Sequence, residues 1–210
     1  DTTFTNTWLF RNQNVAIDVH GIDVHGIKED IDVHGLTFQG LVIEETLPKA
    51  SDQTAGWGLR VATGARVTMT DALLDRSSRQ AIDVHGINTE LAATRLVVRD
   101  TQAQRSDALW GQGLLIGDGA FVMLDDAVFT GNRLAAIDVH GIDGVLEARN
   151  IEVRGTKPRA TDDVFGVGML VTNQASARVV NGTFEGNHAM GVWAHGEGVS
   201  LTLESTTIEN

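Results

Sequence analysis

A 55-residue repeat runs through nearly the whole chain and limits the folds that the chain can adopt. It is marked by equivalent apolar positions at Leu36, Val67, Leu91, Val122, Leu146, Ala177 and Leu201. The steps between these positions alternate between 31 and 24 residues, so each repeat has two unequal halves. Because one pattern continues from end to end, the sequence predicts a single elongated domain over residues 1–210.

Each half-repeat contains three short apolar segments with alternating polarity, such as 67–70, 72–75 and 81–84. Three strands in 24 residues leave no room for a helix, which predicts an all-β fold. Strands that return every turn, or rung, of about 24 residues stack as a parallel β-helix of about seven rungs with three short strands each. A leucine-rich repeat has a similar length, but its Leu-x-x-Leu-x-Leu pattern is missing.

The last strand-like segment, 201–204, is not followed by a polar cap. An open sheet edge tends to pair with another strand. We therefore expect either a continuation of the solenoid or end-to-end association.

The net charge of −12 disfavours a nucleic-acid partner, because phosphate binding needs clustered Lys and Arg. The chain has no cysteine, which excludes disulfides and thiolate metal sites. No apolar run reaches the length of about 18 residues that membrane insertion requires. The expected partner is a glycan or a protein surface.

Asparagines recur at the corner between the second and third strands of a rung, at Asn12, Asn132 and Asn187. Asn tolerates the left-handed backbone conformation of a tight corner, which we expect here. With these corners the chain resembles the right-handed parallel β-helix family, the pectate-lyase-like superfamily. It is also similar to β-helix repeat regions of large exported bacterial proteins, through Arg99-Asp100-Thr101 and Gly-x-Gly segments such as 111–113. This resemblance implies a secreted or cell-surface location.

The pentad Ile-Asp-Val-His-Gly occurs at 17–21, 22–26, 31–35, 82–86 and 137–141, with a degenerate copy at 192–196. In a strand, its Asp and His point outward together. Copies 55 residues apart lie two rungs apart, about 9–10 Å, which is too far for His85 and His140 to share one metal. Gly117 falls between them and adds no ligand, so surface decoration is the simplest interpretation.

The first rung contains ten extra residues, about 22–31, and gathers six potential metal ligands. These are Asp18, His20, Asp23, His25, Asp32 and His34. Three imidazoles and a carboxylate could bind Zn²⁺ or Ni²⁺. The alternative is a flexible, solvated insertion. The identity of the copies also suggests recent duplication, or an engineered β-solenoid with pentads intended for metal binding.

Three long corner loops, 46–58, 101–113 and 156–168, supply the candidate ligand-binding residues. Each offers one aromatic residue and one aspartate: Trp57 and Asp52, Trp110 and Asp107, Phe165 and Asp162. Long loops on a rigid scaffold often carry binding sites, and aromatic faces repeated at about 10 Å would suit a glycan. Alternatively, Trp110 and Phe165 cover the corner of the rung.

Enzymes of the resembled superfamily that act on polysaccharides typically work from the first sheet with carboxylates, Ca²⁺ and a basic residue. The matching positions here are Asp125, Glu147, Arg149 and Arg178. Paired carboxylates can serve glycoside hydrolysis or bind Ca²⁺. The signatures of the pectin-hydrolysing branch are missing, however, and alternating charges on neighbouring rungs are commonly a solvated ladder.

The regularity of the repeats favours a non-catalytic stalk, adhesin or glycan-binding module without a cofactor. The alternatives are a polysaccharide lyase or hydrolase acting on acidic glycans with Ca²⁺, and the engineered metal-binding solenoid with Zn²⁺. A fold of this type can serve all three functions, so only the geometry and chemistry of the site can distinguish between them.

Overall fold

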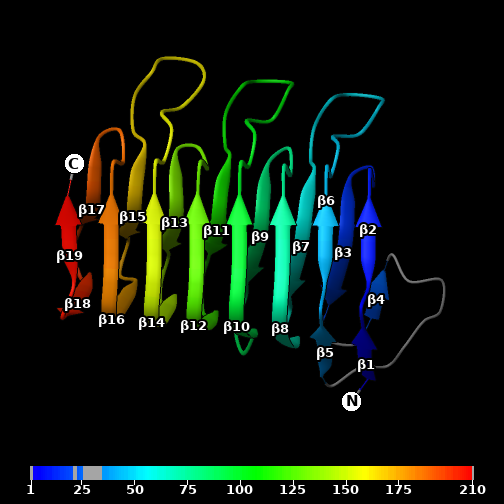
Figure 1. Ribbon diagram of the computed structural model, residues 1–210, viewed down its shortest axis with the longest axis horizontal. Coiled ribbons are helices and arrows are strands. Elements are labelled where there is room, and N and C mark those ends of the chain that lie inside the picture. The colour runs from blue at the N-terminus through cyan, green and yellow to red at the C-terminus, as the bar shows by residue number, and fades with distance from the viewer. Residues whose placement is uncertain (1, 21–22, 26–34, 210) are drawn as a thin grey trace.

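The computed structural model describes residues 2–20, 23–25 and 35–209 and shows an all-β parallel solenoid (Figure 1). Successive rungs build two sheets. Sheet 1 has the strand order β1 (Thr2–Thr5), β5 (Leu36–Gln39), β8 (Arg66–Asp75), β10 (Glu90–Arg99), β12 (Phe121–Thr130), β14 (Val145–Arg154), β16 (Ser176–Glu185) and β18 (Ser200–Glu204), and it includes β2 (Trp8–Phe10), β6 (Val42–Glu44) and β19 (Thr207–Glu209). Sheet 2 has the order β17 (Met190–His195), β15 (Val167–Thr172), β13 (Ala135–His140), β11 (Gln112–Ile116), β9 (Gln80–His85), β7 (Trp57–Ala62), β3 (Val15–His20) and β4 (Asp23–His25).

The register confirms the repeat that the sequence predicts. Leu36 pairs with Val67, Val67 with Leu91, and the same positions continue in parallel pairs up to Leu201. Thr2 pairs with Leu36, a step of 34 residues, so the ten extra residues lie within the first rung. The described part of the chain contains no helix with the length and apolar character that a membrane-spanning segment requires.

The first two strands of each rung form one bent strand in β8, β10, β12, β14 and β16. A residue with positive φ marks the bend, for example Asp71 (φ 57°) or Arg95 (φ 52°), and it is left out of the pairing. This residue shifts the inward alternation by one position, so Met69 before it and Ala72 after it are both buried. The two short faces of the bent strands and the inner face of sheet 2 together enclose one core, which is filled by stacked aliphatic residues and by Phe38, Phe129 and Phe184.

The left-handed conformation predicted for the corner asparagines is wrong. Positive φ falls on the residue before each of them, at Arg11 (53°), Gly131 (65°) and Gly186 (58°). The side chains of Asn132 and Asn187 instead point into the corner and are almost completely buried. They replace missing backbone partners there, which explains the choice of an amide better than its backbone tolerance does.

Asn132 links two rungs at the base of the loop 101–113. Its Oδ1 accepts hydrogen bonds from the Thr101 backbone N–H at 3.2 Å and from the Thr101 hydroxyl at 2.7 Å. Its Nδ2 donates to Val98 O at 3.2 Å. Asn187 makes the equivalent bonds to Thr156 and Val153. The buried amides therefore hold the first residue of each of these two loops in place.

The second glycine of each Gly-x-Gly segment allows adjacent rungs to approach closely at the exit of the loops. A Cβ atom on Gly113 would lie 2.7 Å from the carbonyl oxygen of Ala136 on the next rung and 3.0 Å from the ring of Phe129. Such contacts are shorter than van der Waals distances. The segment therefore anchors the end of the loop against the core.

Candidate functional site

The three long loops project from the same edge of the solenoid, between sheet 1 and sheet 2 (Figure 1). They share one internal hydrogen-bond pattern. In the loop 101–113 the Gln104 N–H donates to Leu109 O at 2.8 Å, and the Leu109 N–H donates to the Asp107 carboxylate at 2.9 Å. Asp52 and Asp162 accept equivalent bonds from Thr54 and Val164. The three aspartates predicted to bind a ligand therefore all stabilise their own loops.

The three predicted aromatic residues do not occupy equivalent positions. Trp110 and Phe165 are equivalent, each with a φ of 68°, but the matching residue of the first loop is Ala55 (φ 67°). Trp57 lies two residues further on, in β7. Trp57 and Trp110 nevertheless share one cation–π partner. The Arg79 guanidinium carbon lies 4.5 Å from the Trp57 ring centre and 4.6 Å from the Trp110 ring centre.

Phe165 packs differently from Trp110. The Phe165 ring stacks on Trp193 with the ring centres 6.0 Å apart. The Arg159 guanidinium carbon lies 5.2 Å from the centre of the Phe165 ring. Arg159 also donates from Nε to the Asp162 carboxylate at 3.0 Å, and this hydrogen bond lowers the pKa of Asp162. The third loop therefore satisfies these side chains partly within the loop, through Arg159, and partly against Trp193 of β17.

A hollow of about 280 Å³ lies beside Trp110, where the second and third loops meet the outer face of sheet 2. We call it the Trp110 hollow. Its lining residues are Leu109, Trp110, Gln112, Leu134, Asp138 and Arg159. The volume is close to the lower end of the range of about 300–1,000 Å³ for small-molecule sites. An aromatic wall, an arginine and a carboxylate therefore meet in one concave place.

Asp138 and Gln112 contribute buried polar groups to this hollow. Asp138 belongs to the pentad 137–141 and points outward, as the sequence predicts, but only 8% of its surface is exposed. The Gln112 amide donates to Asp138 Oδ2 at 3.2 Å, and His140 Nδ1 lies 3.8 Å from Oδ1. Burial raises the pKa of Asp138, because desolvation penalises its charged form. Covered carboxylates of this kind are typical of functional sites.

The equivalent pentad two rungs earlier is fully paired. His85 Nδ1 lies 3.2 Å from Asp83 Oδ1, and Arg60 Nη2 lies 3.3 Å from His85 Nε2. Because Arg can only donate, His85 Nε2 accepts and Nδ1 carries the proton that is donated to Asp83. Asp83 is as buried as Asp138, with 7% of its surface exposed, but it does not line the Trp110 hollow.

The pentad histidines stack as the sequence predicts, with small residues between them. A Cβ on Gly117 would lie 3.2 Å from His85 Cβ and 3.7 Å from His140 Nε2, which places this glycine between the two histidines. Within the described residues, no group of three or more His, Asp or Glu side chains is arranged to hold a metal ion.

The predicted N-terminal metal site lies partly outside the described residues, because these do not include Asp32 and His34. His20 Nε2 lies 2.9 Å from Asp18 Oδ1. Within the inserted pentad the described residues Asp23–His25 form β4, which pairs antiparallel with β3. The register sets His25 opposite Asp18 and Asp23 opposite His20. Zinc or nickel binding by these residues stays a prediction.

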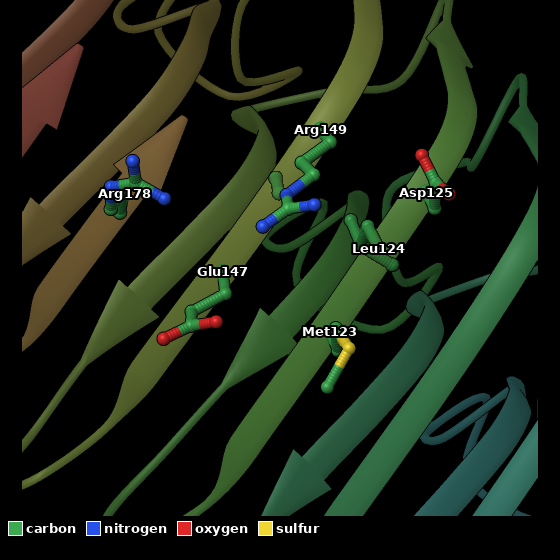
Figure 2. A pocket seen from close by; sticks show the side chains of 7 residues that line it. Met123, Leu124, Asp125, Glu147, Arg149 and Arg178 are labelled. Atoms are coloured by element: carbon green, nitrogen blue, oxygen red, sulfur yellow. The ribbon is translucent and has the colours of Figure 1, made fainter. Parts of the chain in front are cut away.

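The four candidate catalytic residues line one shallow hollow of about 180 Å³ on the outer face of sheet 1 (Figure 2). Asp125 pairs in register with Arg149, and Glu147 with Arg178, across β12, β14 and β16. All four side chains are exposed. Met123 and Leu124 complete the floor of the hollow in the same view.

Two of these four residues already have partners. Arg178 donates to Glu204 at 2.8 Å, and Asp125 accepts from Asn150 at 3.1 Å. Glu147 and Arg149 form no ion pair with any described residue. The arrangement is a solvent-exposed ladder of charged residues, in which the Glu147 carboxylate and the Arg149 guanidinium have no ion-pair partner among the described residues.

Sequence reasoning did not select Gln112, Leu109, Leu134 or Asp138 for a binding site. Gln112 is the middle residue of the segment Gly111-Gln112-Gly113, and its place between two glycines was the available signal. Comparison of the chain with family models, with curated proteins and with solved structures gave no match.

Proposed function

We propose that this chain is a non-catalytic, glycan-binding solenoid of an exported or cell-surface protein, with a right-handed β-helix of the pectate-lyase-like type. The observation that carries the proposal is the Trp110 hollow. It combines an exposed part of an aromatic ring with buried hydrogen-bonding groups on a rigid scaffold, which is the composition expected of a small-ligand site. The remaining rungs would act as a stalk that presents the loops.

The repeated hydrogen bonds of the loops support binding rather than catalysis. Each loop is held by its own aspartate, and two of the three also by a buried corner asparagine, so little ordering is required when a ligand arrives. The candidate catalytic residues on sheet 1, in contrast, are all exposed to solvent. Such an open position gives little electrostatic stabilisation to a transition state.

The second candidate function is cleavage of an acidic polysaccharide on sheet 1. It is favoured by the unpaired Glu147 and Arg149, which share one hollow with Asp125. In this case Arg149 would bind a sugar carboxylate, and the two acids would bind Ca²⁺ or act in proton transfer.

One experiment separates the two functions. The full chain is applied to an array of neutral and acidic polysaccharides, and the bound polymers are then analysed by mass spectrometry with Ca²⁺ and with chelator. We expect binding with intact polymers. Cleavage products that vanish with chelator would favour the enzyme, and an array without any bound polysaccharide would overturn glycan binding.

A further inference from the structure

The floor of the Trp110 hollow presents hydrogen-bond acceptors that need donors. Only 2% of Gln112 is exposed, and its Nε2 is used by Asp138. Its Oε1 is buried without a hydrogen-bond partner among the described residues. A buried acceptor without a donor is unfavourable, so a ligand that brings N–H or O–H groups gains from filling this place.

The wall of the hollow is held in position before any ligand arrives. Arg79 is packed between the rings of Trp57 and Trp110, and burial lowers its pKa. The Trp110 backbone adopts a left-handed conformation that is uncommon for a bulky residue. A tryptophan fixed in this way gives a flat apolar surface at a small entropy cost, which suits stacking against the C–H face of a sugar ring.

The charges around the hollow select against ionic ligands. A cation would meet the Arg79 guanidinium beside Trp110, whereas Arg159 is already paired with Asp162. An anion would meet the Asp138 carboxylate, and it would find Arg159 already paired with Asp162. The net charge of −12 adds a further penalty for polyanions. A neutral ligand rich in hydroxyl groups meets neither penalty.

The set of residues occurs once in the chain. At the positions 55 residues before and after Gln112 stand Trp57 and Val167, and the equivalents of Asp138 are Asp83 and Trp193. The first loop has Ala55 where the second has Trp110. The three loops therefore do not form a ladder of equal subsites.

We propose that the Trp110 hollow is a single subsite for one neutral, hydroxyl-bearing sugar residue, which stacks on Trp110 and donates hydroxyl hydrogens to Asp138 and Gln112. The inference rests on the proposed function and assigns its ligand class and its residues. Arg79 acts as a positioning residue for the Trp110 ring.

Isothermal titration with neutral oligosaccharides of glucose, galactose and mannose tests the subsite, with uronic acid and 2-amino sugar oligomers as competitors. We expect one site per chain for a neutral sugar. Trp110→Ala should weaken binding at least tenfold. Asp138→Asn and Gln112→Met should weaken it about three- to tenfold, because the first removes a charged acceptor and the second removes both the Oε1 acceptor and the Nε2 donor to Asp138. Asp83→Asn is the matched control, since Asp83 is equally buried in the equivalent pentad, and it should bind like the unmodified chain.

The outcomes separate the subsite from the function. If the chain binds a neutral glycan and the three variants bind equally well, the subsite is wrong while glycan binding stands. If the chain binds only uronic acid or amino sugar oligomers, the ligand class is wrong. If no oligosaccharide binds, both proposals fail. Gln112→Met keeps the size of the side chain, so it decides the matter if thermal unfolding shows that Trp110→Ala disturbs the loop.

Discussion

Asp71 on the outer face of sheet 1 and Asp138 on the outer face of sheet 2 differ in solvent exposure and in the direction of their pKa shifts. Asp71 is exposed and accepts two hydrogen bonds from Arg95, at 2.5 and 2.8 Å, which lower its pKa. Asp138 is covered, and burial raises its pKa. Both residues belong to similar rungs. Leu109, Trp110 and Arg159 of the long loops lie around Asp138 in the Trp110 hollow and help to separate it from solvent.

The largest expected effect is on stability and concerns Asn132, which holds the base of the loop 101–113. Asn132→Ala should lower the free energy of unfolding by about 3 kcal/mol, because two buried donors and a carbonyl lose their partner. Urea unfolding followed by circular dichroism measures this loss. The control is Asn150→Gly on sheet 1, which removes exposed hydrogen bonds while keeping the positive φ of 52°, and should change stability by about 0.5 kcal/mol or less. Equal losses of unfolding free energy in the two variants would show that the buried corner contributes no more to stability than the exposed face of sheet 1.

Replacing the two aspartates should change stability in opposite directions. The folded-state pKa of Asp138 is raised, so its charge destabilises the fold as the pH rises from the ordinary carboxyl range through the folded pKa. Asp138→Asn should therefore raise the unfolding temperature at pH 7, by about 1–3 °C, and this gain should disappear in acid. The pKa of Asp71 is lowered, so its stabilisation is present at pH 7 and is lost as the pH falls through the folded pKa.

Asp71→Asn should accordingly lower the unfolding temperature at pH 7 by a smaller amount, and this loss should also vanish in acid. Asn tolerates the positive φ of Asp71, so the backbone is not a complication. Differential scanning calorimetry from about pH 3 to pH 7 records both curves. Two shifts of the same sign would show that loop cover does not distinguish the faces.

The sequence predicts the register of this fold well, because stacking repeats one local rule. The steps of 31 and 24 residues give the strand partners, and outward Asp and His follow from alternation. The covering of Asp138 does not follow from any local rule. It depends on the path of a loop that begins 37 residues earlier and on the packing of Trp110 against Arg79. Trp57 and Trp110 are separated by 53 residues rather than 55, so they occupy different positions of the repeat, and this offset is already visible in the sequence.

The smallest expected effect is on the charge ladder of sheet 1. Arg178 and Glu204 form an ion pair at 2.8 Å with 45% and 48% of their side chains exposed. Solvent screens such a pair, so Arg178→Met should cost between about 0 and 1 kcal/mol at low salt. The difference should fall further as the ionic strength is raised to about 1 M, where the Debye length is about 3 Å. A salt-independent loss above about 2 kcal/mol would mean that the ladder is part of the structural support, and that the exposed face of sheet 1 contributes as much as the covered face of sheet 2.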